Sequence, residues 1–185
     1  YSNPKEIELF EKLYFDVCRL GEFNDDFKKA EPHLRNSDII SINFEAIKAS
    51  ETMDNNGIPN GFYAEQICQI SKYAGISDKV SSFGIFNYIN QTKVSDQLLA
   101  QLIWYFIDGV SKRQHEPDLN NLNHFNEFHT FFSEIDTLFL QSKRSGRWWM
   151  KLPDKQFIAC SKKDYVKASN NQIPERWMRY VERSL

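Results

Sequence analysis

The sequence predicts an α/β protein with a mainly parallel sheet, extended at its C-terminal end by a small α+β portion. Helical and strand patterns alternate over residues 1–113, and this order builds a parallel sheet that helices cover. The alternation stops at a polar linker, residues 114–123, which contains Pro117. Residues 124–185 then predict a tryptophan-containing hairpin and short helices.

The composition is that of an ordinary globular protein, with 41% hydrophobic and 26% charged residues in a chain of 185. A net charge of −2 argues against nucleic acid as a partner. No apolar run approaches the ~20 residues that cross a bilayer, so we expect no membrane span. Cys18, Cys68 and Cys160 match neither a metal site nor a disulfide framework, which favours a cytoplasmic protein.

The N-terminal segment predicts a helix that Asn3 caps, with Pro4 at its first position and Gly21 as its stop. Apolar residues recur at helical spacing through most of this segment. A shorter helix is expected at residues 24–31. It ends before Pro32, because proline disfavours a helical backbone in the residue that precedes it.

Residues 38–45 (DIISINFE) predict the first strand, since they are rich in β-formers and bounded by polar residues. Side chains alternate along a strand, so three apolar residues face the core and three polar residues share the other face. The apolar set is Ile40, Ile42 and Phe44, and the polar set is Ser41, Asn43 and Glu45. Active sites of α/β folds usually lie where such strands end, which makes Asn43 and Glu45 candidate site residues.

After a turn-rich loop at residues 52–61, residues 63–74 predict an amphipathic helix that Gly75 closes. Residues 80–86 (VSSFGIF) predict a second strand, in which Gly84 permits the close approach of another backbone.

A long helix follows, from a Ser95 cap to about Lys112. Its central part, residues 98–107 (LLAQLIWYFI), is apolar nearly all round. We therefore expect this helix to be deeply buried or covered by a partner.

In the C-terminal portion, phenylalanines recur at near-helical spacing over residues 125–132. Residues 137–141 and 147–152 predict two strands joined by a turn at 143–146. Two short helices are expected after them, one capped by Ser161 and reaching Ala168, and the other at residues 174–185. The extension is expected to pack against the main sheet as an appendage.

The run 143–151 (KRSGRWWMK) places basic residues beside two tryptophans. The candidate partner-binding residues are Arg144, Arg147, Trp148 and Trp149. They could stack on and neutralise a single-stranded nucleic acid. Alternatively, the indole rings cover the core while the basic side chains extend to solvent. We favour packing or a subunit contact.

Several segments resemble, in order, the C-terminal half of the ureohydrolases, the family of arginase, agmatinase and formimidoylglutamase. They are residues 38–48 (DIISINFEAIK), 59–63 (PNGFY), 72–80 (KYAGISDKV), 83–86 (FGIF) and 101–109 (QLIWYFIDG). The tail motifs SGRWWM and IPERW resemble an extension of the formimidoylglutamase-like arginase homologues of Bacteroidetes-type bacteria. The resemblance covers nearly the whole chain. It implies half of a three-layer α/β/α sandwich.

In such enzymes two aspartates at the end of a strand hold a pair of manganese ions, and the metals bind the attacking hydroxide. The matching positions here are Asn43, which is neutral, and Glu45, which is one methylene longer. The family's glutamate that anchors the cationic substrate group is matched by Asn87, at the start of the segment 87–90 (NYIN). The family's Asp-x-His-x-Asp motif is absent from these 185 residues.

The resemblance therefore implies a homologue with degenerate metal and substrate positions, with no catalytic residue and no cofactor in this chain. We expect a non-catalytic binding or assembly subunit. One alternative is a metal-dependent hydrolase of guanidino or formimino compounds that a missing N-terminal half completes. Another is a binding module that uses the basic tryptophan hairpin. Because helix-forming sequence begins directly at Tyr1, we expect a fragment or a processed product. A C-terminal half alone would leave a sheet edge and the apolar helix uncovered, so we also expect the N-terminal half or other subunits as partners in an oligomer.

Overall fold

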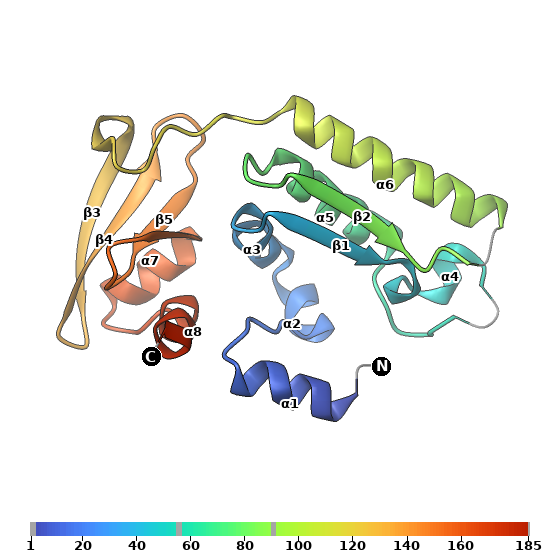
Figure 1. Cartoon of the computed structure of the whole chain (residues 1–185), viewed down its shortest axis with the longest axis horizontal. Coiled ribbons are helices and arrows are strands. Elements are labelled where there is room, and N and C mark those ends of the chain that lie inside the picture. Colours follow the sequence, from blue (N-terminus) through green and yellow to red (C-terminus); the bar gives the residue numbers. More distant parts are fainter. Residues whose placement is uncertain (1–2, 55–56, 90–91, 185) are drawn as a thin grey trace. The chain divides into compact units, whose positions relative to one another are not determined.

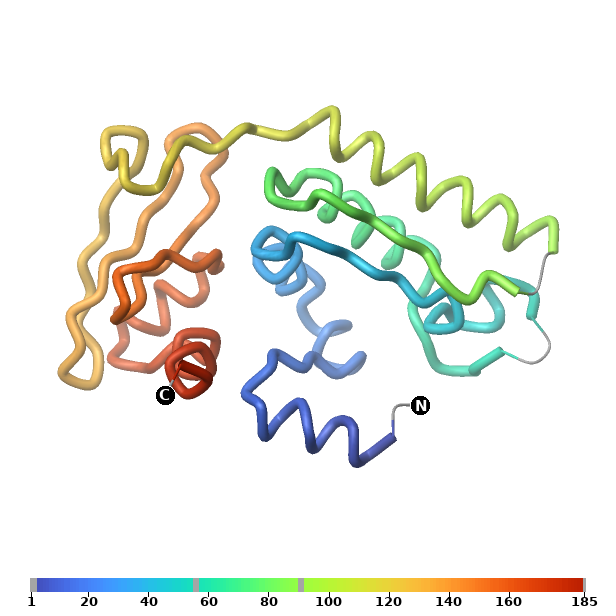
Figure 2. Tube along the Cα trace, in the orientation of Figure 1, coloured from blue at the N-terminus to red at the C-terminus, as the bar shows by residue number. Residues whose placement is uncertain are grey.

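The computed structural model describes residues 3–54, 57–89 and 92–184. The chain divides into two compact units (Figure 1, Figure 2). The α/β unit is Leu20–His115, and the second unit combines Tyr1–Arg19 with Glu116–Leu185. The first 19 residues, which the sequence analysis placed in the α/β portion, therefore belong with the C-terminal residues. None of the helices in the described ranges has the length and apolar character that a bilayer crossing needs.

The α/β unit contains a parallel sheet of two strands, as the alternation of elements predicted. Strand β1 (Ile39–Asn43) pairs with β2 (Ser82–Phe86), and Ile40 lies opposite Phe83. The helical segments of this unit are α2 (Leu20–Asp25), η1 (Phe27–Lys29), α3 (Ala30–Arg35), η2 (Phe44–Ala46), α4 (Ala49–Thr52), α5 (Ala64–Ile76) and α6 (Lys93–Ser111). The α/β class with a parallel sheet is confirmed.

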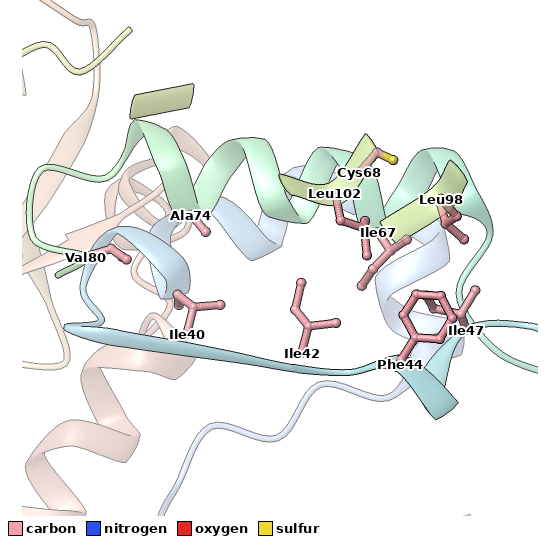
Figure 3. Close-up of a cluster of buried hydrophobic side chains, with 10 residues drawn as sticks. All are labelled: Ile40, Ile42, Phe44, Ile47, Ile67, Cys68, Ala74, Val80, Leu98 and Leu102. Atoms are coloured by element: carbon pink, nitrogen blue, oxygen red, sulfur yellow. The ribbon is translucent and has the colours of Figure 1, made fainter. Parts of the chain in front are cut away.

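One face of this sheet forms the core of the unit. Figure 3 shows Ile40 and Ile42 pointing from β1 toward the helices that cover it, where Leu102 of α6 is fully buried. The predicted alternation along β1 is confirmed, because residues 40 and 42 are buried while 39, 41 and 43 are exposed. The cluster comprises Ile40, Ile42, Phe44, Ile47, Ile67, Cys68, Ala74, Val80, Leu98 and Leu102.

Helices α5 and α6 approach each other closely where Gly75 lies against Gly109. A Cβ on Gly75 would stand 2.1 Å from the Phe106 carbonyl oxygen, and one on Gly109 would stand 2.5 Å from the Lys72 carbonyl oxygen. The prediction that Gly75 ends its helix is wrong, since α5 continues to Ile76. This glycine is required by the approach of a neighbouring backbone and not by a turn.

The start of α6 also differs from the prediction. Thr92 is the cap, since its hydroxyl accepts the Ser95 N–H at 3.0 Å, and the Ser95 hydroxyl accepts the Thr92 N–H at 2.7 Å. Ser95 is thus the third helical residue of a capping box. Deep burial of this helix is not observed, because Trp104 and Ile107 are each 60% exposed. A single layer of neighbours covers only the opposite stripe of the helix.

The N-terminal helix is shorter than predicted. In α1 (Pro4–Lys12), Asn3 accepts the Lys5 N–H at 3.0 Å as the predicted cap, but the helix ends at Lys12. Tyr14 follows with a φ of 54°, a left-handed conformation that a helix cannot contain. Gly21 lies inside α2 instead of ending a helix.

Pro32 lies inside a helix, which overturns the expectation that a helix ends before it. It is the third residue of α3. Proline is tolerated in the first turn because the N–H groups there have no partner within the helix.

The second unit contains an antiparallel sheet in the order β3-β4-β5-β6, with helices packed on it, which confirms the α+β extension. Its elements are α1, η3 (Leu122–His124), β3 (Phe125–Phe132), β4 (Ile135–Ser142), β5 (Trp148–Lys151), β6 (Phe157–Cys160), α7 (Lys162–Ser169) and α8 (Glu175–Ser184). The predicted hairpin and the Ser161 cap of α7 are confirmed. Leu185, the predicted last helical residue, lies outside the described ranges.

The phenylalanine-rich segment is a strand and not a helix. Phe128 and Phe132 lie on the face that packs with Trp148, whereas Phe125 lies on the other face with Trp149. A spacing of 125, 128 and 132 fits a helix, but it also fits a strand that is apolar on both faces. Strand β6 was not predicted from the sequence.

Replacing either close-contact glycine with alanine tests the α5–α6 packing. Gly75→Ala or Gly109→Ala is expected to lower the free energy of unfolding by about 1–3 kcal/mol, because the methyl group would overlap backbone of the other helix. Gly21→Ala is the matched control, since nothing lies within 4 Å of its added Cβ. Chemical denaturation followed by circular dichroism measures all three, and an equal loss at Gly21 would contradict the explanation.

Asp108 of α6 links the same helices electrostatically. Its carboxylate lies 2.6 Å from Lys112 Nζ and 3.1 Å from Lys72 Nζ of α5. Hydrogen bonds from Lys112 and then Lys72 lower the pKa of Asp108 below its ordinary value of 3.8. A carboxyl whose pKa is lower in the folded state stabilises the fold above its ordinary pKa, and this stabilisation is lost as the pH falls below that value.

Asp108→Asn is therefore expected to lower the melting temperature at neutral pH. The difference from the unmodified chain should shrink as the pH falls below about 3.8, because the native carboxyl is then protonated too. Melting curves across this range measure the effect. Asp25→Asn, at an exposed position, is the control and should leave the curves unchanged. A deficit that persists in acid would show that charge is not its cause.

Candidate functional site

The residues predicted for the site meet at the carboxyl end of the parallel sheet. Asn43 is the last residue of β1 and pairs with Phe86, the last residue of β2, so Asn87 emerges at the same end. Glu45 follows within the 3₁₀ turn η2. Loops at the carboxyl ends of parallel strands are the usual position of ligand sites in α/β folds.

Hydrogen bonds join these three side chains. The Asn43 Oδ1 atom accepts the backbone N–H of Glu45 at 3.0 Å and thereby caps the turn. The Asn87 Nδ2 atom donates to Asn43 Oδ1 at 3.3 Å and to Glu45 Oε2 at 3.4 Å. Asn87 has a φ of 57°, a left-handed conformation that asparagine tolerates better than most residues. Its amide therefore connects the ends of the two strands.

This donor set does not fit a pair of divalent cations. The three side chains supply one carboxylate and two neutral amides, and an N–H₂ group is directed at the oxygens of both other residues. Divalent metals need several oxygen ligands, preferably anionic. Among the residues that the structure describes, no group of three His, Cys, Asp or Glu side chains could hold a metal ion.

Two further polar pairs belong to the residues around these strand ends. The Tyr88 hydroxyl donates to the Asp96 carboxylate, and this hydrogen bond raises the pKa of Tyr88. The Lys48 ammonium donates to the Tyr63 hydroxyl at 3.0 Å. Sequence reasoning did not single out Lys48, Tyr63 or Asp96, because their pairing depends on segments that only the fold brings together. Asn90, the last residue of the segment 87–90 that the family resemblance singled out, lies outside the described residues.

The four residues predicted for partner binding have separate environments. Trp148 and Trp149 are each 7% exposed. Trp148 stacks on Tyr165 at 5.0 Å between ring centroids, whereas Trp149 packs on the other face against Phe125. Buried rings cannot stack on nucleic acid, so packing is the role that this geometry favours.

The two arginines of this hairpin differ in the same way. Arg147 lies 3.8 Å from the Glu116 carboxylate, and both side chains are mostly buried. Arg144 is exposed in the turn between β4 and β5. Of the four predicted residues, only Arg144 is therefore on the surface.

Comparison with known proteins gives a fold. No family model matches the chain, and no curated protein matches it. A solved structure, formimidoylglutamase from Bacillus subtilis, is similar with a TM-score of 0.52 and 15% sequence identity. The match covers 61% of this chain and 40% of that chain, so this chain spans less than half the length of its structural neighbour. The likeness shows that the matched part of this chain shares the α/β fold of formimidoylglutamase, and at this identity it shows the fold alone.

Substitutions at Asn87 separate its backbone role from its hydrogen bonds. Asn87→Gly and Asn87→Ala both remove the amide, but only alanine is strained at a φ of 57°. The alanine variant should therefore be less stable than the glycine variant by about 1 kcal/mol. Thermal unfolding of both variants measures this difference. Equal stabilities would mean that the left-handed conformation relaxes on substitution.

Proposed function

We propose that this chain is a non-catalytic relative of the ureohydrolases and acts as a binding or assembly subunit in the cytoplasm. The single observation that carries the proposal is the Asn87 amide, which donates to the side-chain oxygens of both Asn43 and Glu45. In the resemblance to that family, these three residues stand at the metal-binding and substrate-binding positions.

The chemistry of these positions supports the proposal. Replacing an aspartate by Asn43 removes a negative charge that a bridged pair of metal ions requires. Asn87 in place of a glutamate leaves no carboxylate to pair with a guanidinium or formimino cation. The remaining carboxylate, Glu45, accepts the Asn87 amide and so serves to join the strand ends. Each position thereby contributes to local structure in a way that does not need a metal.

Exposed apolar surface supports the assembly role. Ile39 on the uncovered face of β1 is 69% exposed, and Trp104 and Ile107 on α6 are 60% exposed. Parallel sheets are almost always covered on both faces, and monomers rarely expose large apolar patches. We propose that the N-terminal half of the same protein or other subunits cover these residues in an oligomer, and that the chain belongs to the formimidoylglutamase-like subgroup of Bacteroidetes-type bacteria.

Metal content and hydrolysis test the proposal together. After incubation with excess Mn²⁺ and desalting, the chain is expected to retain no stoichiometric manganese by mass spectrometry, because one carboxylate is too few anionic ligands. It should also release no product from formimidoylglutamate, arginine or agmatine. Formimidoylglutamase of Bacillus subtilis is the positive control for the formimidoylglutamate assay.

The alternative is a hydrolase that further polypeptide completes. It predicts that a longer product of the gene binds two manganese ions and hydrolyses a guanidino or formimino compound. That result would overturn the non-catalytic proposal. A Glu45→Gln variant serves as the comparison, because it removes the one remaining carboxylate and would abolish such binding if Glu45 were a ligand.

A further inference from the structure

Charge is distributed very unevenly along this chain. Residues 143–185 contain eleven Lys or Arg against four Asp or Glu, a net charge of +7. Residues 1–142 contain twelve Lys or Arg against 21 Asp or Glu, a net charge of −9. The total of −2 hides this separation. A local excess of this size is the electrostatic footprint of a surface that binds anions.

The fold gathers part of this positive charge at one end of the antiparallel sheet. Trp148 of β5 pairs with Cys160 of β6, so the turn before Trp148 and the helix after Cys160 emerge at the same end. The turn carries Lys143 and Arg144, and α7 begins with Lys162 and Lys163, all of them exposed. Lys167 is exposed one helical turn after Lys163. These five residues are called the basic surface.

Two acidic side chains beside this surface take part in hydrogen bonds that hold its elements. The Asp164 carboxylate accepts the backbone N–H and the hydroxyl of Ser161 in the capping box of α7. Glu116 accepts the Ser142 hydroxyl at 2.7 Å and lies beside Arg147. The Lys143 ammonium donates to the backbone carbonyl of Asn123 at 2.9 Å. Residues 143–147 and 161–167, which carry the basic surface, contain six Lys or Arg against one acidic residue, Asp164, a net charge of +5.

The character of this surface indicates its partner. Protein interfaces need an apolar and aromatic core, and membrane attachment needs residues that insert, but both nearby tryptophans are buried. Binding of single strands also depends on exposed aromatic rings. Isolated lysines suffice for the regularly spaced phosphates of a duplex, where affinity comes from the release of counterions. We infer that the basic surface binds the phosphate backbone of duplex nucleic acid without sequence preference.

Two adjacent lysine pairs give a matched test. Lys162 and Lys163 belong to the basic surface, whereas Lys28 and Lys29 are exposed in η1 within an acidic stretch of the other unit. Charge reversal of either pair to glutamate changes the net charge of the whole chain by the same amount. Fluorescence anisotropy of a labelled short DNA duplex, at several salt concentrations between about 50 and 200 mM, measures binding by the full chain.

The Lys162→Glu/Lys163→Glu variant is expected to lose about tenfold or more in affinity, and its salt slope should fall by about 2, since two phosphate contacts are removed. The Lys28→Glu/Lys29→Glu variant should bind as the unmodified chain does. Circular dichroism and the melting temperature establish that the variants are folded. If the Lys162→Glu/Lys163→Glu variant is not folded, Lys162→Gln/Lys163→Gln takes its place in the binding measurement.

Four results would overturn the inference. The first is the absence of duplex binding at low salt, and the second is an equal loss of affinity in both charge-reversed variants. The third is binding of poly-glutamate as tight as binding of the duplex. The fourth is binding of phosphatidylserine vesicles at least as tight as binding of the duplex. The second would mean that overall charge and not this surface governs binding. The last two would assign the surface to an acidic protein or to a membrane. None of these outcomes bears on the metal and hydrolase measurements.

Discussion

The α/β unit depends on the close approach of α5 and α6 at Gly75 and Gly109. No other residue fits there, since a Cβ on either glycine would overlap backbone of the facing helix. This contact allows both helices to lie over the buried face of the two strands. At its other end α6 is held by the Thr92 hydroxyl, which donates to the Thr52 carbonyl at 2.9 Å. Asp96, one turn into the helix, thereby reaches Tyr88 beyond β2.

The carboxyl end of the sheet shows how a position can be reused for structure. Asn43 caps a turn, and Asn87 occupies a left-handed conformation and bridges two strand ends. Amides suit these tasks because each carries both a donor and an acceptor. A cluster of carboxylates would repel itself there without a cation. Hydrogen bonding within the cluster and metal binding are therefore competing uses of the same geometry.

Local patterns in the sequence predicted several features of the fold. The Asn3 and Ser161 caps and the hairpin at Trp148 follow from interactions among residues close in the chain. The strand at 39–43 was also predicted from its local composition and alternation, although its partner β2 lies far along the chain. Asn43 and Asn87 meet because parallel strands place their carboxyl ends together, whereas the sequence had singled out Asn87 only through the family resemblance. The early end of the first helix could not be foreseen, since its apolar spacing continues beyond Tyr14.

Only the tertiary structure decided the rest. A glycine after a helical pattern predicts a helix end, and the facing backbone of α6 made Gly75 a contact residue instead. Phenylalanine spacing fits helix and strand equally, and pairing with β4 selected the strand for residues 125–132. The burial of Trp148 and Trp149 on opposite faces likewise required the sheet. The sequence thus determined the features that depend on residues close in the chain, such as helix caps and turns. The close approach of two helices and the burial of side chains depended on distant segments that only folding brings together.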